Sequence, residues 1–239
     1  MENFSYSKIS TFLKCPKAYK YSYIDKVEED FDSIERFMGH AVHETLEWVL
    51  ANGYATLMHL DECLDFYKNQ WKNNYSSFVK VIKRDKTSED YYALGEIMLR
   101  DYFHILHERE REEVIALENR FEYPLNKNIT YTGIIDCISR KQDGTISITD
   151  YKTGSMRDVN SNLNQIKSYA MHIFDEYNVR TVELKLDYLQ EKKSVVSIYT
   201  SREAVSEIIP YLLNNIEIIA NASNFYRSKS ILCDWCGYN

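Results

Sequence analysis

Two aspartates and a lysine interrupt apolar sequence between residues 132 and 154. The stretch reads TGIIDCISRKQDGTISITDYKTG and contains Asp136, Asp150 and Lys152. Charges inside strand-like segments cost free energy unless a partner compensates them. Carboxylate oxygens are ligands that Mg²⁺ and Mn²⁺ prefer, and an amine beside them can orient a water molecule or steady a phosphate. The residue types therefore predict a divalent-metal site; the alternative is a salt-bridge cluster at a sheet edge.

The Asp-Gly dipeptide at 143–144 predicts a tight turn between two strands. A three-residue loop would place Asp136 directly opposite Asp150, whereas a two-residue loop would place it opposite Tyr151. We expect the three-residue loop, because this class needs glycine at its left-handed third position, where Gly144 stands. Two opposed carboxylates repel each other unless a cation lies between them, so this register favours the metal site.

The hydrophobic pattern around this hairpin predicts helices followed by strands in α/β order. We expect helices near 7–15, 37–53, 56–76, 87–112, 161–175 and 202–221, and strands near 114–124, 130–139, 145–152, 182–190 and 194–200. Three successive strands, a crossover helix and two more strands predict a mixed central β-sheet flanked by helices, beside an N-terminal helical lobe. We interpret 1–239 as one domain: a mostly helical lobe (1–112), an α/β core (113–222) and a cysteine-containing tail (223–239).

Composition limits the class of protein. The chain has 239 residues and a formal net charge of −7, which gives no global reason to expect nucleic acid. It contains no apolar run of membrane-spanning length, so we expect no membrane association. An odd number of cysteines and a beginning unlike a signal peptide predict a cytoplasmic location.

The segment 8–26 departs from the overall acidity. It holds five lysines against one acid, with tyrosines between them. Lysines can contact phosphates and aromatic rings can stack on unpaired bases, so Lys17 and Tyr19 are candidate substrate contacts. The alternative interpretation is a solvated helix face beside the edge of a tyrosine-rich core.

The motifs together resemble the PD-(D/E)XK nuclease superfamily, in its RecB-type exonuclease branch. The resemblance rests on the order of SYSKISTFLKCPKAYKYSYI, GHAVHETLE, GIIDCI, ITDYKTG, QIKSYAMHI and CDWCGY. That branch includes the CRISPR-adaptation nuclease and stand-alone phage nucleases. The resemblance implies a restriction-endonuclease-like core and a metal-dependent deoxyribonuclease, an exonuclease acting on single-stranded DNA or DNA ends in recombination, repair or CRISPR-type adaptation.

The resemblance also implies roles for individual residues. A Mg²⁺ or Mn²⁺ ion would be held by His43, Asp136, Asp150 and the backbone carbonyl of Tyr151, with Lys152 serving the attacking water. We prefer His43 to the nearby His40 on the motif match. Gln165 and Tyr169, four residues apart on one helix face, would contact the substrate strand or the lysine. Glu118, on the first predicted core strand, is a possible accessory group.

Three cysteines resemble part of the cluster-binding pattern found in many relatives. Cys15, Cys233 and Cys236 match three ligands of a [4Fe–4S] cluster, but the fourth cysteine is missing. Cys63 and Cys137 are not obvious replacements. A cluster completed by another ligand, a zinc ion with a histidine or water, and unligated thiols all remain open.

Two other classes of function remain possible. The first is a nucleic-acid-binding module that has lost catalysis, although every expected ionic residue is present. The second is a component of a larger repair or adaptation complex, so a protein partner or a homo-oligomer is possible.

Overall fold

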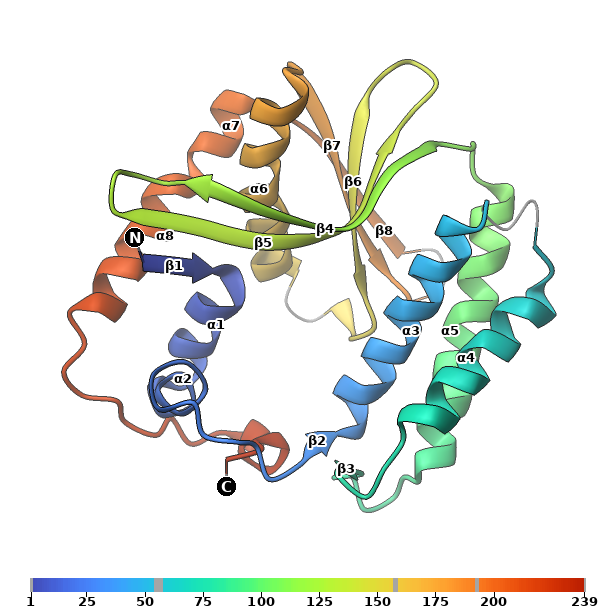
Figure 1. Ribbon diagram of the computed structural model, residues 1–239, viewed down its shortest axis with the longest axis horizontal. Helices are drawn as coiled ribbons and strands as arrows, with labels where there is room; N and C mark the ends of the chain where they lie inside the picture. Colours follow the sequence, from blue (N-terminus) through green and yellow to red (C-terminus); the bar gives the residue numbers. More distant parts are fainter. Residues whose placement is uncertain (1, 54–57, 157–158, 192–193, 239) are drawn as a thin grey trace.

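The computed structural model describes residues 2–53, 58–156, 159–191 and 194–238 (Figure 1). The helical segments are α1 (Tyr6–Lys14), α2 (Pro16–Tyr19), η1 (Lys20–Asp25), α3 (Ile34–Ala51), α4 (Leu60–Asn74), α5 (Ser88–Glu108), α6 (Val159–Tyr177), α7 (Arg202–Ser206), α8 (Ile208–Ala220) and η3 (Ile231–Trp235). The strands are β1 (Glu2–Ser5), β2 (Asp32–Ser33), β3 (Val79–Lys80), β4 (Glu113–Pro124), β5 (Ile129–Arg140), β6 (Ile146–Lys152), β7 (Thr181–Tyr188) and β8 (Ser194–Ser201).

A six-stranded mixed sheet forms the centre of the fold. Its path is β1-β5-β6-β7-β8, and β4 pairs with β5 as well. The β4–β5, β5–β6 and β7–β8 pairs are antiparallel, whereas β1–β5 and β6–β7 are parallel. The predicted fold class is confirmed. The sequence pattern did not reveal β1, which brings the N-terminal segment into the sheet.

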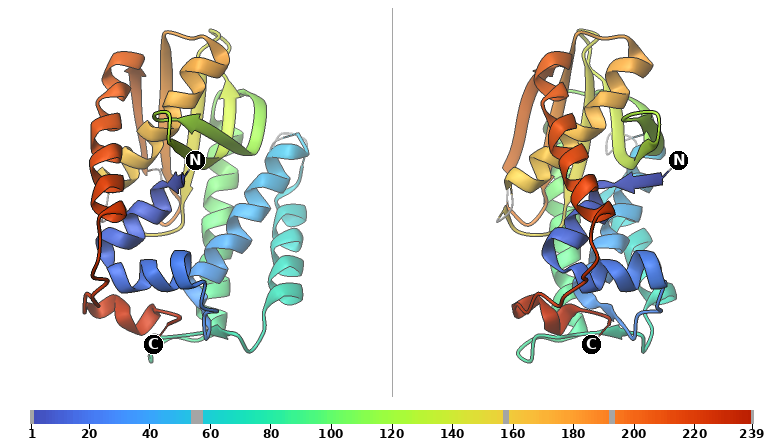
Figure 2. Two further views of the ribbon diagram at one scale, coloured as in Figure 1. Left: turned by 60° about the vertical axis from the view of Figure 1, so that its left-hand side comes forward. Right: turned by 90° about the vertical axis from the view of Figure 1, so that its left-hand side faces the viewer.

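Helices cover both faces of the sheet (Figure 2). A separate hydrophobic core lies on each face. One core lies between the sheet and α1, α6 and α8, and contains Ile146, Ile148 and Phe174. The other lies between the sheet and α3, α4 and α5, and contains Cys137 and Tyr151. Within the described part of the chain, no helix has the length and apolar character needed to cross a membrane.

The β5–β6 hairpin adopts the expected register. The last ladder pair is Cys137 with Thr149, so Asp136 and Asp150 are the next two residues in register beyond it. The backbone N–H of Lys141 donates to the carbonyl of Thr145 at 2.9 Å, which closes a three-residue loop. Gly144 has φ of 85°, the left-handed conformation that predicted this loop.

Strand β5 changes its neighbour halfway along one edge. Residues Cys137–Arg140 pair with β6, whereas Ile129–Thr132 pair with β1. The segment 133–136 therefore lies between the two ladders and leaves an opening in the sheet at Asp136. A Cβ atom at Gly133 would come within 2.5 Å of the Phe121 ring, so only glycine fits where β5 passes this ring.

Several helix boundaries differ from the predicted ones. Helix α1 begins at Tyr6, one residue before the expected start, and Ser5 caps it by accepting a hydrogen bond from the backbone N–H of Lys8. The single helix expected near 202–221 is two helices, α7 and α8, separated at Glu207. Pro210 lies in the first turn of α8, where its missing N–H costs no helical hydrogen bond.

We predict that Gly144→Ala destabilises the fold by about 1 kcal/mol, because an L-residue resists the left-handed conformation. Nothing lies within 4 Å of a Cβ added there, so the cost comes from the backbone alone. Urea unfolding measures the change. Gly154→Ala is the matched control, since Gly154 is equally open; an equal loss in both variants would contradict the prediction.

Candidate active site

The end of β6 presents a carboxylate and an ammonium group side by side. Asp150 is only 4% exposed, and its Oδ2 lies 2.5 Å from Nζ of Lys152. The ammonium also donates to Oε1 of Gln165 at 2.9 Å, and Nε2 of Gln165 donates to the hydroxyl of Tyr169 at 2.6 Å. The i, i+4 spacing on α6 therefore lines both side chains up behind the lysine.

Asp136 stands at the opening in β5. Its Oδ2 accepts a hydrogen bond from the backbone N–H of Tyr151 at 2.7 Å and lies 3.6 Å from Nδ1 of His43. His43 reaches this point from the middle of α3. Since N–H and C=O of one residue in an extended strand point to the same edge, the Tyr151 carbonyl faces the same edge of β6 as its N–H. The hairpin and α3 thus bring oxygen and imidazole donors together.

Glu118 approaches Asp136 from the neighbouring strand. The β4–β5 register runs through Leu117 with Cys137 and Asn119 with Ile135, so Glu118 stands opposite Asp136. Its φ of 45° is left-handed, although the residue is not glycine. Such strain collects where a side chain must be aimed at a site. Donor atoms of His43, Glu118 and Asp136 all lie within 4.8 Å of one another.

Electrostatics at this cluster favours bound cations over bare acids. Burial, and then the neighbouring Asp150, hold the pKa of Asp136 well above its ordinary value. Burial, and then Glu47, raise the pKa of Glu118. Burial lowers the pKa of His43, which keeps the imidazole neutral and able to donate a lone pair.

The donor set fits a divalent metal ion. Two carboxylates and one neutral imidazole within ligand distance of each other match the nitrogen and oxygen ligands that Mn²⁺ accepts, and the carboxylates match Mg²⁺. Oδ2 of Asp150 is buried and makes no hydrogen bond to the described residues, although the Lys152 ammonium lies beside it. Mutual repulsion among these acids is the expected cost of a site built to receive positive charge.

A cavity of about 1020 Å³ opens above these groups. Its lining combines Asp136, His43, Glu118, Gln165 and Tyr169 with residues that sequence reasoning missed: Ser5, Ser7, Arg36, Glu44, Glu47 and Arg120. Glu47 lies one helical turn beyond His43, so helix spacing could have indicated it. Arg120 lies on β4, Ser5 ends β1 and Ser7 lies in α1, and no local sequence signal placed them at this cavity.

The remaining substrate contacts predicted from the sequence lie elsewhere. His40 lines the same cavity as His43, but it is exposed and pairs with Glu44 at 3.1 Å, so His43 is the histidine of the cluster. Lys17 lines a separate pocket, with Nζ 5.4 Å from the centre of the Tyr21 ring. Tyr19 is 7% exposed and packs edge-on against Phe12, so its ring is part of the hydrophobic core, and its substrate contact stays a prediction.

The tail cysteines gather with Cys15 beside that separate pocket. Cys15, Cys233 and Cys236 line a space of about 240 Å³. Among the described residues, their thiols do not form a group within 4.8 Å of one another, as a single zinc ion would require. Three thiols leave a [4Fe–4S] cluster one ligand short. The cluster therefore stays a prediction, and no step of the chemistry depends on it.

The chain belongs to the PD-(D/E)XK nuclease superfamily, because the model of that family matches residues 3–239. The match confirms the family identified from the motifs. It follows that the protein is a nuclease by family.

Individual relatives and a solved structure agree with this family. A component of the ATP-dependent helicase/deoxyribonuclease of Streptococcus agalactiae is 28% identical over 156 residues, which are 64% of this chain and 14% of that protein. The corresponding protein of Streptococcus pyogenes serotype M49 is 28% identical over 123 residues, 50% of this chain and 11% of that protein. This chain thus spans a small part of these relatives. A candidate exonuclease from Eubacterium rectale shares the fold, with a TM-score of 0.54 at 11% identity over 98% of this chain and 87% of that chain.

We predict that Asp136→Asn stabilises the metal-free protein at neutral pH. The pKa of the Asp136 carboxyl is raised in the folded protein. Its contribution to stability is therefore fully present at low pH and is lost as pH rises through the folded pKa. A neutral amide does not ionise, so the variant avoids this loss of stability at neutral pH. Thermal unfolding in EDTA should show a higher Tm for the variant at pH 7.5 and a difference that vanishes near pH 4.

The same variant should lose most of its response to Mn²⁺. Wild type is expected to gain about 2.7 kcal/mol at a Mn²⁺ concentration 100 times the Kd. Asp143→Asn is the control: this turn carboxylate is exposed and has a lowered pKa, because it accepts a hydrogen bond from the backbone N–H of Thr145, so it should not gain stability at neutral pH. A destabilised Asp136→Asn protein with an intact Mn²⁺ response would refute the assignment.

Proposed function

We propose that the protein is a Mg²⁺- or Mn²⁺-dependent deoxyribonuclease that hydrolyses phosphodiester bonds, with an exonuclease preference for single-stranded DNA or DNA ends. One observation carries this proposal: the His43, Glu118 and Asp136 cluster lines a cavity, and the Asp150–Lys152 pair adjoins that cavity through the hydrogen bond from Lys152 to Gln165. The family supplies nuclease chemistry, and this geometry supplies a place for the metal beside the lysine.

His43, Asp136, Asp150 and the Tyr151 carbonyl would hold the metal, and Glu118 would complete the set. A bound divalent ion supplies Lewis-acid activation of the phosphate and lowers the pKa of a water molecule. The protein's part is to keep the donors close. The N–H of Tyr151 orients the Asp136 carboxylate, and burial keeps His43 neutral.

Lys152 is the group best placed to act on the attacking water or on the phosphate. Its ammonium is fixed by Asp150 on one side and by the Gln165 carbonyl oxygen on the other. A cation held in this way can stabilise negative charge that develops during hydrolysis, and it costs no reorganisation. Gln165 and Tyr169 line the cavity, so they can also contact the substrate strand.

The wider setting of the proposal comes from the named relatives. The streptococcal proteins are, by name, components of an ATP-dependent helicase/deoxyribonuclease. We extend this to a role in DNA recombination, repair or CRISPR-type adaptation in the cytoplasm, with a protein partner or a second copy of the chain. Lys17, beside the second pocket, would provide a further phosphate contact away from the metal.

The decisive prediction concerns Asp150→Asn. Losing this carboxylate removes a proposed metal ligand and the ion-pair partner of Lys152, so Mn²⁺-dependent cleavage should fall by roughly 10²–10⁴-fold. The assay uses 5′- and 3′-labelled single strands with Mg²⁺, Mn²⁺ or EDTA, and the order of products also gives the polarity. Glu113→Gln is the control, since that side chain is 66% exposed and pairs with Arg140 at the surface.

The same experiment separates catalysis from simple binding. A catalytic site predicts that Asp150→Asn loses cleavage while strand binding, measured by fluorescence anisotropy, is retained. Equal cleavage by wild type and variant would exclude the proposed site. A wild type that binds strands without cleaving them under any metal condition would favour a non-catalytic nucleic-acid-binding role instead.

A further inference from the structure

Tyr151 connects the candidate active site to the far face of the sheet. Its backbone N–H holds Asp136 at 2.7 Å. Its side chain is 6% exposed within the core formed with α3, α4 and α5. There its ring meets the His43 ring edge-on at 6.1 Å and the Tyr102 ring at 5.5 Å. A shift of Tyr151 would therefore disturb Asp136 and His43 together.

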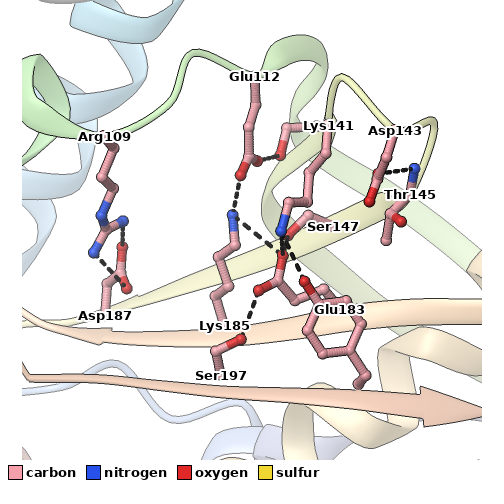
Figure 3. Close-up of polar contacts among 12 residues, drawn as sticks. Arg109, Glu112, Lys141, Asp143, Thr145, Ser147, Glu183, Lys185, Asp187 and Ser197 are labelled. Atoms are coloured by element: carbon pink, nitrogen blue, oxygen red, sulfur yellow. Dashed lines mark hydrogen bonds and ion pairs between the residues drawn. The ribbon is translucent and has the colours of Figure 1, made fainter.

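A buried carboxylate lies directly beside this tyrosine. Asp187 is the register partner of Tyr151 on β7 and is only 1% exposed. It accepts hydrogen bonds from Nη1 and Nη2 of Arg109 at 2.8 and 3.4 Å (Figure 3). It also accepts a hydrogen bond from the hydroxyl of Tyr102. Arg109 follows the last residue of α5. A buried carboxylate without such partners would be strongly destabilising, so the contacts fix α5 to β7 at this point.

The rest of β7 provides an internal comparison. Glu183 is also a buried carboxylate on this face, and its register partner is Ser147. It accepts hydrogen bonds from Ser147 at 3.2 Å and Ser197 at 2.6 Å, and lies 3.3 Å from Nζ of Lys141 beside the hairpin turn (Figure 3). The two acids thus have similar burial and pairing, but only Asp187 lies next to a residue of the candidate site.

We propose that Asp187, held by Arg109 and Tyr102, is a positioning residue for the candidate active site and acts through Tyr151. The inference rests on the proposed function. The ion pair fixes the Tyr102 hydroxyl, the Tyr102 ring fixes the Tyr151 ring, and Tyr151 sets the position of Asp136 and the packing of His43. Groups that orient metal ligands in this way typically change metal affinity or rate about 10–100-fold when removed.

The hydroxyl groups of Tyr102 and Tyr151 remain protonated at neutral pH. Burial, and then the charge of Asp187, hold the pKa of Tyr102 well above its ordinary value. Burial, and then Tyr102, do the same for the pKa of Tyr151. The Tyr102 hydroxyl therefore remains a donor to Asp187, and the arrangement does not depend on a proton being lost.

The test compares Asp187→Asn with Glu183→Gln. Both exchange a buried carboxylate of β7 for an amide, so both should lose some stability in urea unfolding. Only Asp187→Asn should weaken Mn²⁺ binding, measured by calorimetry on metal-free protein without DNA, by about tenfold or more, and lower kcat with an unchanged KM for a labelled strand. Equal Mn²⁺ affinity and equal kcat in the two variants would overturn the proposal.

A second pair of variants removes only one hydroxyl group each, so the proposal can still be tested if Asp187→Asn does not fold. Tyr102→Phe keeps the ring and the Arg109–Asp187 pair but removes the hydroxyl, and it should reduce Mn²⁺ affinity in the same direction. Tyr67→Phe is matched to it, since Tyr67 is fully buried in α4 and its hydroxyl donates to the carbonyl of Tyr92 at 3.3 Å; its Mn²⁺ affinity should be unchanged. If wild type binds Mn²⁺ but cleaves no strand, the nuclease proposal fails, while these affinities still decide the role of Asp187.

Discussion

The structure depends on one constraint: β5 cannot pair with β1 and β6 at the same residues of one edge. It pairs with β1 through Thr132 and with β6 from Cys137, and the segment between them stays open. Asp136 lies in this opening, where the end of β6, the middle of β4, α3 and α6 converge. The candidate site is thus a consequence of strand pairing, because a continuous ladder would place backbone where the cavity now lies.

The opening concentrates unfavourable features that the surrounding fold must support. Glu118 adopts a left-handed conformation, which costs roughly 1–2 kcal/mol for an L-residue. Asp136 and Glu118 have raised pKa values because burial and neighbouring acids oppose their charge. Two well-packed cores, one on each face of the sheet, hold these groups in place. A divalent cation would turn the same repulsion into binding energy, so strain and charge here indicate function.

Local rules explain why the hairpin could be predicted and other parts could not. The Asp-Gly dipeptide at 143–144 fixes the loop, and alternation along β6 then places Asp150 beside Lys152, without information from the rest of the chain. By contrast, β1 pairs with a strand more than 120 residues away in sequence. The burial of Tyr19 depends on Phe12 and Phe225, brought together from opposite ends of the chain. Composition alone could not separate this aromatic core from a stacking surface.

The negative charge of the cavity links metal binding to substrate binding in the chemistry proposed here. The cavity contains five carboxylates, Glu44, Glu47, Glu118, Glu122 and Asp136, and a DNA strand is itself a polyanion. Of the basic side chains that line it, Arg36 is already paired with Glu29 and Asp32. Arg120 and the nearby Lys152 cannot balance these acids alone. Neutralisation by divalent cations is therefore a condition for a phosphate to approach Asp136, so metal binding and substrate binding at this site must be thermodynamically coupled.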